Sequence, residues 1–300
     1  MVIILKSVLG FLTALFGFYY LTDVYKNRAS FCPTPWPRLL GTGFITNMFD
    51  TLGIGSFAQQ TAIFKFFKMV DDRIIPGTMN VGNTIPTVVQ AFIFMKMVEV
   101  EPLTLAAMSI AAPAGAVLGA GVVAKMSRRR IQLGMGCGLL VIAFIILAGL
   151  LKWFPMGGVA IGLTGWKLVV AVVMSFIFGA MQTIGVGFYA PCMAIVYTLG
   201  MHPLTAYPIM MTATAMLMAA GSARFVKEKA YDPKASIALT LFGILGVFLG
   251  AFLLYILKSM DINKVLTILR WMVICVVLYT SVWMFISAAT GRKETACPEA

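Results

Sequence analysis

The chain has 300 residues, of which 60% are hydrophobic and only 11% are charged, and its formal net charge is +12. Soluble domains carry about 25% charged residues, so this composition excludes an ordinary soluble protein and predicts a chain that lies largely in a lipid bilayer. The basic residues lie mostly in short loops between apolar runs, where they orient membrane helices. The net charge therefore does not indicate nucleic-acid binding, and we expect no nucleic acid among the partners.

Residue types that hold metals or perform covalent catalysis are sparse. The five cysteines are scattered without C-x-x-C spacing, and His202 is the single histidine of the sequence. Zinc sites and disulfide frameworks need such residues in characteristic spacings. The sequence therefore predicts no metal, no cofactor and no enzyme active site.

The predicted elements begin with an apolar run at 2–22, which is long enough to span a bilayer. No small-residue cleavage site follows it, so we interpret residues 1–38 as a retained helix and a loop. A long segment from Leu39 to Met69 comes next and is broken near its centre. A second broken segment runs from Leu168 to Gly200. Three apolar helices follow each broken segment, predicted at 74–97, 102–124 and 130–151, and then at 204–224, 234–258 and 264–288.

Glycine and proline landmarks recur at a nearly constant spacing in the two halves. Gly53 and Gly55 return as Gly185 and Gly187, and further pairs follow in the same order with one gap. Chance similarity between apolar segments is the alternative. We expect an all-α, polytopic membrane protein built from two repeats, a common design of secondary transporters. The predicted divisions are repeat 1 at 39–152, repeat 2 at 153–289 and a tail at 290–300.

Each broken segment can be either a re-entrant hairpin or a bent single crossing. Two hairpins place the basic loops around 125–130 and 224–234, and the tail with Arg292 and Lys293, on one side of the membrane. Cytoplasmic loops are rich in Lys and Arg. This charge distribution favours hairpins, a cytoplasmic C-terminus and repeats that are inverted relative to each other.

The broken segments predict a central site for an anion. A helix that starts after a break exposes unpaired N–H groups and the positive end of its dipole, and glycines allow a ligand to approach the backbone. The alternative is that the glycines only permit tight helix packing. Polar residues near the breaks can bind a substrate or bond between helices. The predicted substrate-binding residues are Gly53, Gly55, Ser56, Gln59, Gln60, Asn83, Gly185, Gly187, Tyr189, Thr212 and Thr214.

Asp50 is the clearest acid within an apolar segment, and Gln182 takes its place in the second half. An intramembrane carboxylate that can be charged or neutral is a candidate for coupling transport to protons or cations. It could instead cap a helix or pair with a base. Arg270 could contact an anion, but a long side chain near a helix end is expected to snorkel to the interface.

These motifs resemble those of the TauE/SafE sulfite exporter family, also called toluene-sulfonate uptake permeases. The second half is most similar, with Gly185-Val186-Gly187 followed by Ala190-Pro191. The resemblance extends from about Leu39 to about Ile286. The third glycine of the family motif is Ser56 in one half and Phe188 in the other, so the family's substrate does not transfer directly.

The resemblance implies a secondary transporter, an exporter or permease, for small sulfur-containing anions such as sulfite, thiosulfate or organosulfonates. We expect it in a bacterial inner membrane, coupled to protons or ions, with a homodimer as one possible assembly. The alternatives are an anion channel or uniporter and, from another class, a non-catalytic membrane assembly subunit. Uphill flux driven by a pH gradient would exclude a channel.

Overall fold

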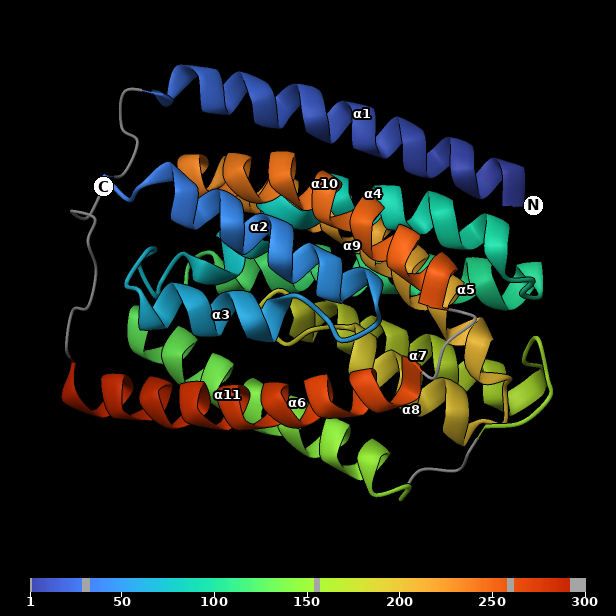
Figure 1. Cartoon of the computed structure of the whole chain (residues 1–300). Coiled ribbons are helices and arrows are strands. Elements are labelled where there is room, and N and C mark those ends of the chain that lie inside the picture. Colours follow the sequence, from blue (N-terminus) through green and yellow to red (C-terminus); the bar gives the residue numbers. More distant parts are fainter. Residues whose placement is uncertain (1, 29–32, 154–156, 258–261, 292–300) are drawn as a thin grey trace.

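The structure of the chain is a computed structural model that describes residues 2–28, 33–153, 157–257 and 262–291. Within these residues the chain forms eleven α-helices and a short 3-10 helix, and this helical content confirms the all-α class. The β-structure among them is a single isolated bridge between Ala160 and Met201. The helices run roughly along one direction in a single bundle, with α1 along its outer edge (Figure 1). Their bounds are α1 Val2–Lys26, α2 Trp36–Thr51, α3 Phe57–Phe66, α4 Ile75–Met97, α5 Pro102–Val123, α6 Arg128–Leu150, α7 Gly165–Gln182, α8 Tyr189–Thr198, α9 Ala206–Lys227, α10 Pro233–Leu257 and α11 Ile262–Thr290.

Seven described helices are long and apolar enough to cross a membrane, which confirms a multi-pass membrane protein. These spans lie in α1, α5, α6, α7, α9 with the turn before it, α10 and α11. Helix α4 is also long, but its buried amides, among them Asn80, Asn83 and Gln90, lower its hydropathy. Polar side chains in a membrane face the protein interior, so α4 lies in the middle of the bundle.

Both broken segments are re-entrant hairpins. The Thr34 hydroxyl, just before α2, donates to the carbonyl of Met69, just after α3, at 2.9 Å. In the second half, Lys167 Nζ at the start of α7 donates to the carbonyl of Leu199 after α8, at 3.1 Å. Because the two ends of each segment meet, neither segment is a bent single crossing.

The two hairpins open on opposite ends of the bundle, which we call side A and side B. Side A holds the open end of the first hairpin, where Lys234 at the start of α10 donates to the Thr34 carbonyl at 2.7 Å. Side B holds the open end of the second hairpin, where the backbone N–H of Glu101, just before α5, donates to the carbonyl of Ile161, just before α7, at 2.9 Å. Helix α5 runs from side B to side A, so the hairpins enter the bundle from opposite directions.

Equivalent glycines pack the first arm of each hairpin against a helix of the other half. A Cβ on Gly115 of α5 would lie 1.9 Å from the Phe176 carbonyl oxygen of α7, and a Cβ on Gly246 of α10 would lie 2.2 Å from the Phe44 oxygen of α2. The two contacts are equivalent: in each, a glycine of one half packs against the first hairpin arm of the other half. We therefore propose that residues 39–152 and 153–289 are two inverted copies of one unit, with the helix at 2–26 outside the repeat.

The hairpin arms are less equal than the sequence predicts. The first arms, α2 and α7, have 16 and 18 residues, whereas the return arms, α3 and α8, have 10 each. A linker without α-helix follows each return arm, and the linker after α8 contains the short 3-10 helix Pro203–Thr205. The basic pair at 292 and 293 lies outside the described residues.

Candidate functional site

The hairpin tips are built around glycines with positive φ. Helix α2 ends where Gly53, with φ of +85°, donates its N–H to the Asp50 carbonyl, and Ile54 donates to Phe49. Helix α7 ends in the same way at Gly185, with φ of +102°. Side chains with a Cβ disfavour this backbone region, so glycine is the residue that lets the chain turn back within the bundle.

Each return helix begins at the tip with backbone N–H groups that have no partner within the helix. The first helical bonds are donated by Gln60 to Ser56 in α3 and by Cys192 to Phe188 in α8. The N–H groups before Gln60 and Cys192 have no partner within their helix, and neither N-cap side chain bonds them. Pro191 has no N–H, so α8 offers one donor fewer than α3. Both helix starts carry the positive end of a helix dipole, which favours an anion.

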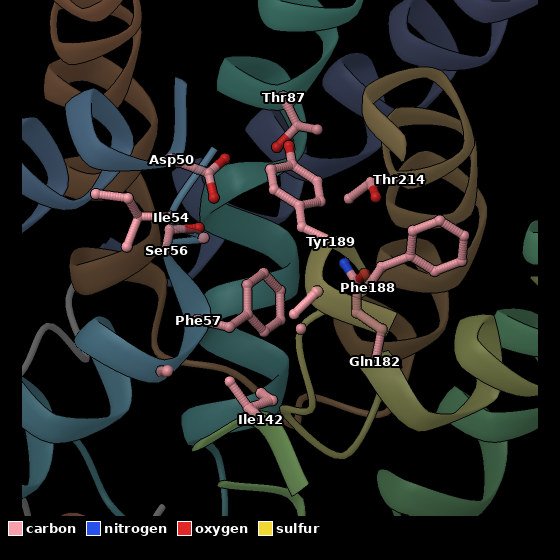
Figure 2. A pocket seen from close by; sticks show the side chains of 14 residues that line it. Asp50, Ile54, Ser56, Phe57, Thr87, Ile142, Gln182, Phe188, Tyr189 and Thr214 are labelled. Carbon is pink, nitrogen blue, oxygen red and sulfur yellow. The ribbon is translucent and has the colours of Figure 1, made fainter. Parts of the chain in front are cut away.

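Both helix starts line one pocket between the hairpin tips. The pocket takes residues from both tips and from α4, α6 and α9 (Figure 2). Its polar lining consists of Asp50, Ser56, Thr87, Gln182, Tyr189 and Thr214. Its apolar lining includes Ile54, Phe57, Ile142 and Phe188. The two glycine breaks therefore share one cavity.

Two buried side chains at this pocket have polar atoms without a partner. Neither the Nε2 nor the Oε1 atom of Gln182 has a hydrogen bond, and the Thr214 hydroxyl has none either. Gln182 is 1% exposed and Thr214 is 3% exposed. A buried polar group without a partner costs about 1–3 kcal/mol. These groups are therefore available to a polar ligand in the pocket.

Asp50 lies at the same pocket in a polar surrounding. Its carboxylate interacts with the hydroxyl and backbone N–H of Ser56, with Gln90 and with Tyr189. The Tyr189 hydroxyl donates to Gln90 Oε1 at 2.9 Å, which holds the tyrosine ring in place. Asp50 is thus a buried acid at the start of α3, directly beside the space that a ligand would occupy.

Other predicted site residues are engaged in a polar network behind the pocket. Asn83 Nδ2 donates to Gln60 Oε1 at 2.6 Å, and Gln60 Nε2 donates back to Asn83 Oδ1 at 2.9 Å. Gln60 also bonds Thr46, and Asn47 donates to Asn83. These groups hold α2, α3 and α4 together. Their amide donors are bonded to acceptors within the network rather than pointing at a ligand.

The structure places the predicted residues in two groups. One group lines the pocket and consists of Gly55, Ser56, Gly187, Tyr189 and Thr214, together with Asp50. The other group lies outside the pocket lining and consists of Gly53, Gln59, Gln60, Asn83, Gly185 and Thr212. Gly53 and Gly185 form the turns, and Gln59 Nε2 bonds the Gly55 carbonyl at 2.7 Å. Thr212 is buried with an unpaired hydroxyl.

Several lining residues were not among those predicted. Thr87 lies one helical turn after Asn83, so the polar face of α4 could have been followed one turn further. Gln182 lies at the position that corresponds to Asp50 and could have been found by that correspondence. The apolar lining residues carry no sequence signal that separates them from ordinary packing. Among the described residues, no cluster of three or more His, Cys, Asp or Glu side chains could hold a metal ion.

Residues 2–146 of the chain match the family model described as "Sulfite exporter TauE/SafE". The matched region runs from α1 into α6 and includes the first hairpin with Asp50 and Ser56. Searches of curated proteins and of solved structures found no match.

Proposed function

From the match of residues 2–146 to the family model described as "Sulfite exporter TauE/SafE", we propose that the protein is a secondary transporter of a small sulfur-containing anion. Sulfite, thiosulfate and organosulfonates are the candidates. The anion would bind in the pocket between the hairpin tips. It would then leave on the other side of the membrane.

The observation that carries this proposal is the pair of buried, unpaired groups at the pocket, Gln182 and Thr214. The oxygens of an oxyanion would accept hydrogen bonds from the Gln182 amide, the Thr214 hydroxyl and the N–H groups at the starts of α3 and α8. Hydrogen bonds to a charged group are worth about 1.5–3 kcal/mol each. An anion thus satisfies donors that the folded protein leaves unpaired, whereas a cation would face the positive ends of two helices.

The opposite entry directions of the hairpins support alternating access as the mode of transport. Transporters built from inverted repeats move one bundle against the other around a fixed midplane site. Movement of one hairpin would expose the pocket to side A, and the equivalent movement of the other hairpin would expose it to side B.

Asp50 is our candidate for the coupling group. At an effective dielectric constant of about 20, two negative charges about 5 Å apart repel each other by about 3 kcal/mol. An anion in the pocket would therefore bind best when Asp50 is protonated. A proton and the anion would cross the membrane together, and a pH gradient would drive the anion uphill.

The alternative is an anion channel or uniporter, which needs no titrating group. Flux measured with and without a pH gradient separates the two mechanisms. Accumulation of the anion above its equilibrium ratio, driven by the gradient, excludes a channel. Equilibration that ignores the gradient would contradict the coupled carrier.

The family match supports a bacterial inner membrane, and the charge distribution supports an orientation with side A in the cytoplasm. The basic residues Lys125, Arg129, Arg130, Lys227 and Lys229 lie at the side-A ends of the helices. Cytoplasmic loops are rich in such residues. Helix α11 also ends on side A, which would place the C-terminal tail in the cytoplasm.

The direct experiment is sulfite flux into proteoliposomes that contain the purified protein. We expect saturable flux whose half-saturating sulfite concentration rises by about tenfold or more in Gln182→Leu, because the apolar side chain cannot bond the anion. Thermal stabilisation of the purified protein by sulfite gives an independent readout, since a ligand that binds the folded state raises its stability. Flux and stabilisation that are unchanged in Gln182→Leu would contradict the proposed site.

A further inference from the structure

Gln90 is a buried amide of α4 that connects the two hairpin tips. Its Nε2 atom donates to the hydroxyl oxygen of Thr51, the last residue of α2, at 3.0 Å. Its Oε1 atom accepts from the hydroxyl of Tyr189, the first residue of α8, at 2.9 Å. Gln90 is 0% exposed and is not among the residues that line the pocket, whereas Tyr189 is. Gln90 therefore acts on the pocket through Tyr189.

A backbone carbonyl fixes the direction of these hydrogen bonds. The Thr51 hydroxyl donates its single hydrogen to the carbonyl of Asn47 at 2.8 Å, and a carbonyl can only accept. The Thr51 oxygen then accepts from Gln90, so the amide nitrogen faces Thr51 and the amide oxygen faces Tyr189. Tyr189 has one hydroxyl hydrogen, and it is given to Gln90. The tyrosine consequently has no hydrogen left to donate to a ligand.

The Tyr189 oxygen presents its lone pairs towards the pocket. The hydroxyl lies beside the side chains of Asp50 and Thr87, which both line the pocket (Figure 2). Gln90 lies three residues after Thr87 on α4 and outside the lining. Because the hydroxyl hydrogen points to Gln90, it points away from the lining residues. Tyr189 is thus a hydrogen-bond acceptor of the pocket.

We propose that Gln90 is a positioning residue that makes Tyr189 an acceptor, and that the pocket therefore selects an oxyanion that carries a hydrogen-bond donor of its own. This inference rests on the proposed transport function and deepens it by naming the substrate class. Such a ligand would donate to Tyr189 and accept from Gln182 and Thr214, whose polar atoms are unpaired. Hydrogensulfite belongs to this class, whereas sulfate at neutral pH has only acceptors. A site built for a hydrogen bond rejects analogues that lack it, because a buried polar group is left unpaired.

The test compares two ligands of nearly equal size and equal charge. Sulfamate and methanesulfonate are both monoanions with three oxygens on sulfur, and the fourth group is an amino group in one and a methyl group in the other. Thermal stabilisation of the purified full-length protein over a range of ligand concentrations gives a dissociation constant for each. We expect sulfamate to bind about tenfold more tightly, since it alone can donate to Tyr189.

The variants change the partner of the tyrosine. In Gln90→Leu the Tyr189 hydroxyl loses its acceptor and is free to turn its hydrogen into the pocket, so the preference for sulfamate should fall to about twofold or less. Gln90→Glu still offers Tyr189 an acceptor oxygen and should keep the preference, although the added acid weakens the binding of both anions. Thr84→Val is the matched control, because the buried Thr84 of α4 bonds Ser222 of α9 and no hairpin tip. A purely structural role of Gln90 would weaken both ligands equally and leave their ratio unchanged.

Equal binding of the two ligands by the unmodified protein would overturn the proposal. So would stabilisation by neither ligand, or a tenfold preference that persists in Gln90→Leu. If Gln90→Leu cannot be purified, Tyr189→Phe takes its place, because it removes the acceptor itself; a retained preference in this variant would also overturn the proposal. These measurements need no flux, so a protein that prefers sulfamate but does not transport sulfite would refute the transport function alone.

Discussion

The two hairpins have the same backbone plan but use their polar side chains differently. In the first hairpin, Gln60 is bonded to Thr46 and Asn83 in a closed network. In the second hairpin, the residue that corresponds to Gln60 is Cys192, which is fully buried, and Gln182 has no partner at all. The richly polar hairpin is therefore held by its own hydrogen bonds, whereas the sparsely polar one leaves donors free.

This difference separates groups that stabilise the fold from groups that can bind a ligand. A buried network in which each donor meets an acceptor contributes rigidity, while a buried amide without a partner lowers stability until a ligand satisfies it. We therefore expect substitutions in the network to reduce stability and substitutions of the unpaired groups to reduce binding.

Closing the pocket should have the largest effect. In Gly187→Leu the new Cβ would lie 3.8 Å from the Phe57 Cβ, an ordinary contact, so the backbone accepts it. The rest of the leucine would then fill the space between the tips, and we expect no sulfite flux above that of empty liposomes. Gly17→Leu in α1 is the control, because nothing lies within 4 Å of that position. Normal flux in Gly187→Leu would show that the anion does not pass between the tips.

A pair of glutamine variants tests the comparison itself. Gln182→Leu should weaken sulfite binding by about tenfold or more, since a hydrogen bond to a charged group is lost, without reducing stability. Gln60→Leu should instead cost about 2 kcal/mol of stability, because the buried amide of Asn83 loses both of its hydrogen bonds to Gln60. Thermal melting with and without sulfite measures both effects. The reverse pattern would mean that the network, and not the unpaired amide, binds the anion.

Replacing the buried acid should separate coupling from movement. One pH unit is worth about 1.4 kcal/mol per proton, so it can accumulate a proton-coupled anion by about tenfold. In Asp50→Asn we expect this accumulation to disappear, while exchange of labelled for unlabelled sulfite continues. The measurement is uptake into proteoliposomes with an imposed pH gradient. Retained tenfold accumulation in the variant would rule out Asp50 as the proton-binding group.

The smallest effect is expected from replacing either of two threonines by valine, a substitution that removes the hydroxyl group and keeps the shape of the side chain. Thr214→Val removes an unpaired hydroxyl at the pocket and should weaken sulfite binding by about fivefold, the equivalent of about 1 kcal/mol. Thr46→Val removes one of the two acceptors of the Gln60 amide and should lower stability by about 1 kcal/mol with unchanged binding. Equal affinities in the two variants would remove Thr214 from the site.

The sequence predicts the hairpins well because their turns have a strict backbone requirement. Gly53 and Gly185 occupy a region of φ that other residues avoid, and their repetition marks both tips. The polar side chains are harder to assign, because Gln60 and Asn83 look as available as Gln182 until packing pairs them. Only the positions of the neighbouring helices decide which amide has a partner. The apolar walls of the pocket, such as Phe57 and Ile142, have no local signature either.

The most direct test of the shared anion site is a density map of the protein determined with millimolar sulfite, compared with one determined without it. We expect density for one sulfite ion between the starts of α3 and α8, within hydrogen-bonding distance of the Gln182 amide and the Thr214 hydroxyl. Sulfite bound at another place, in a protein that still transports it, would contradict the account.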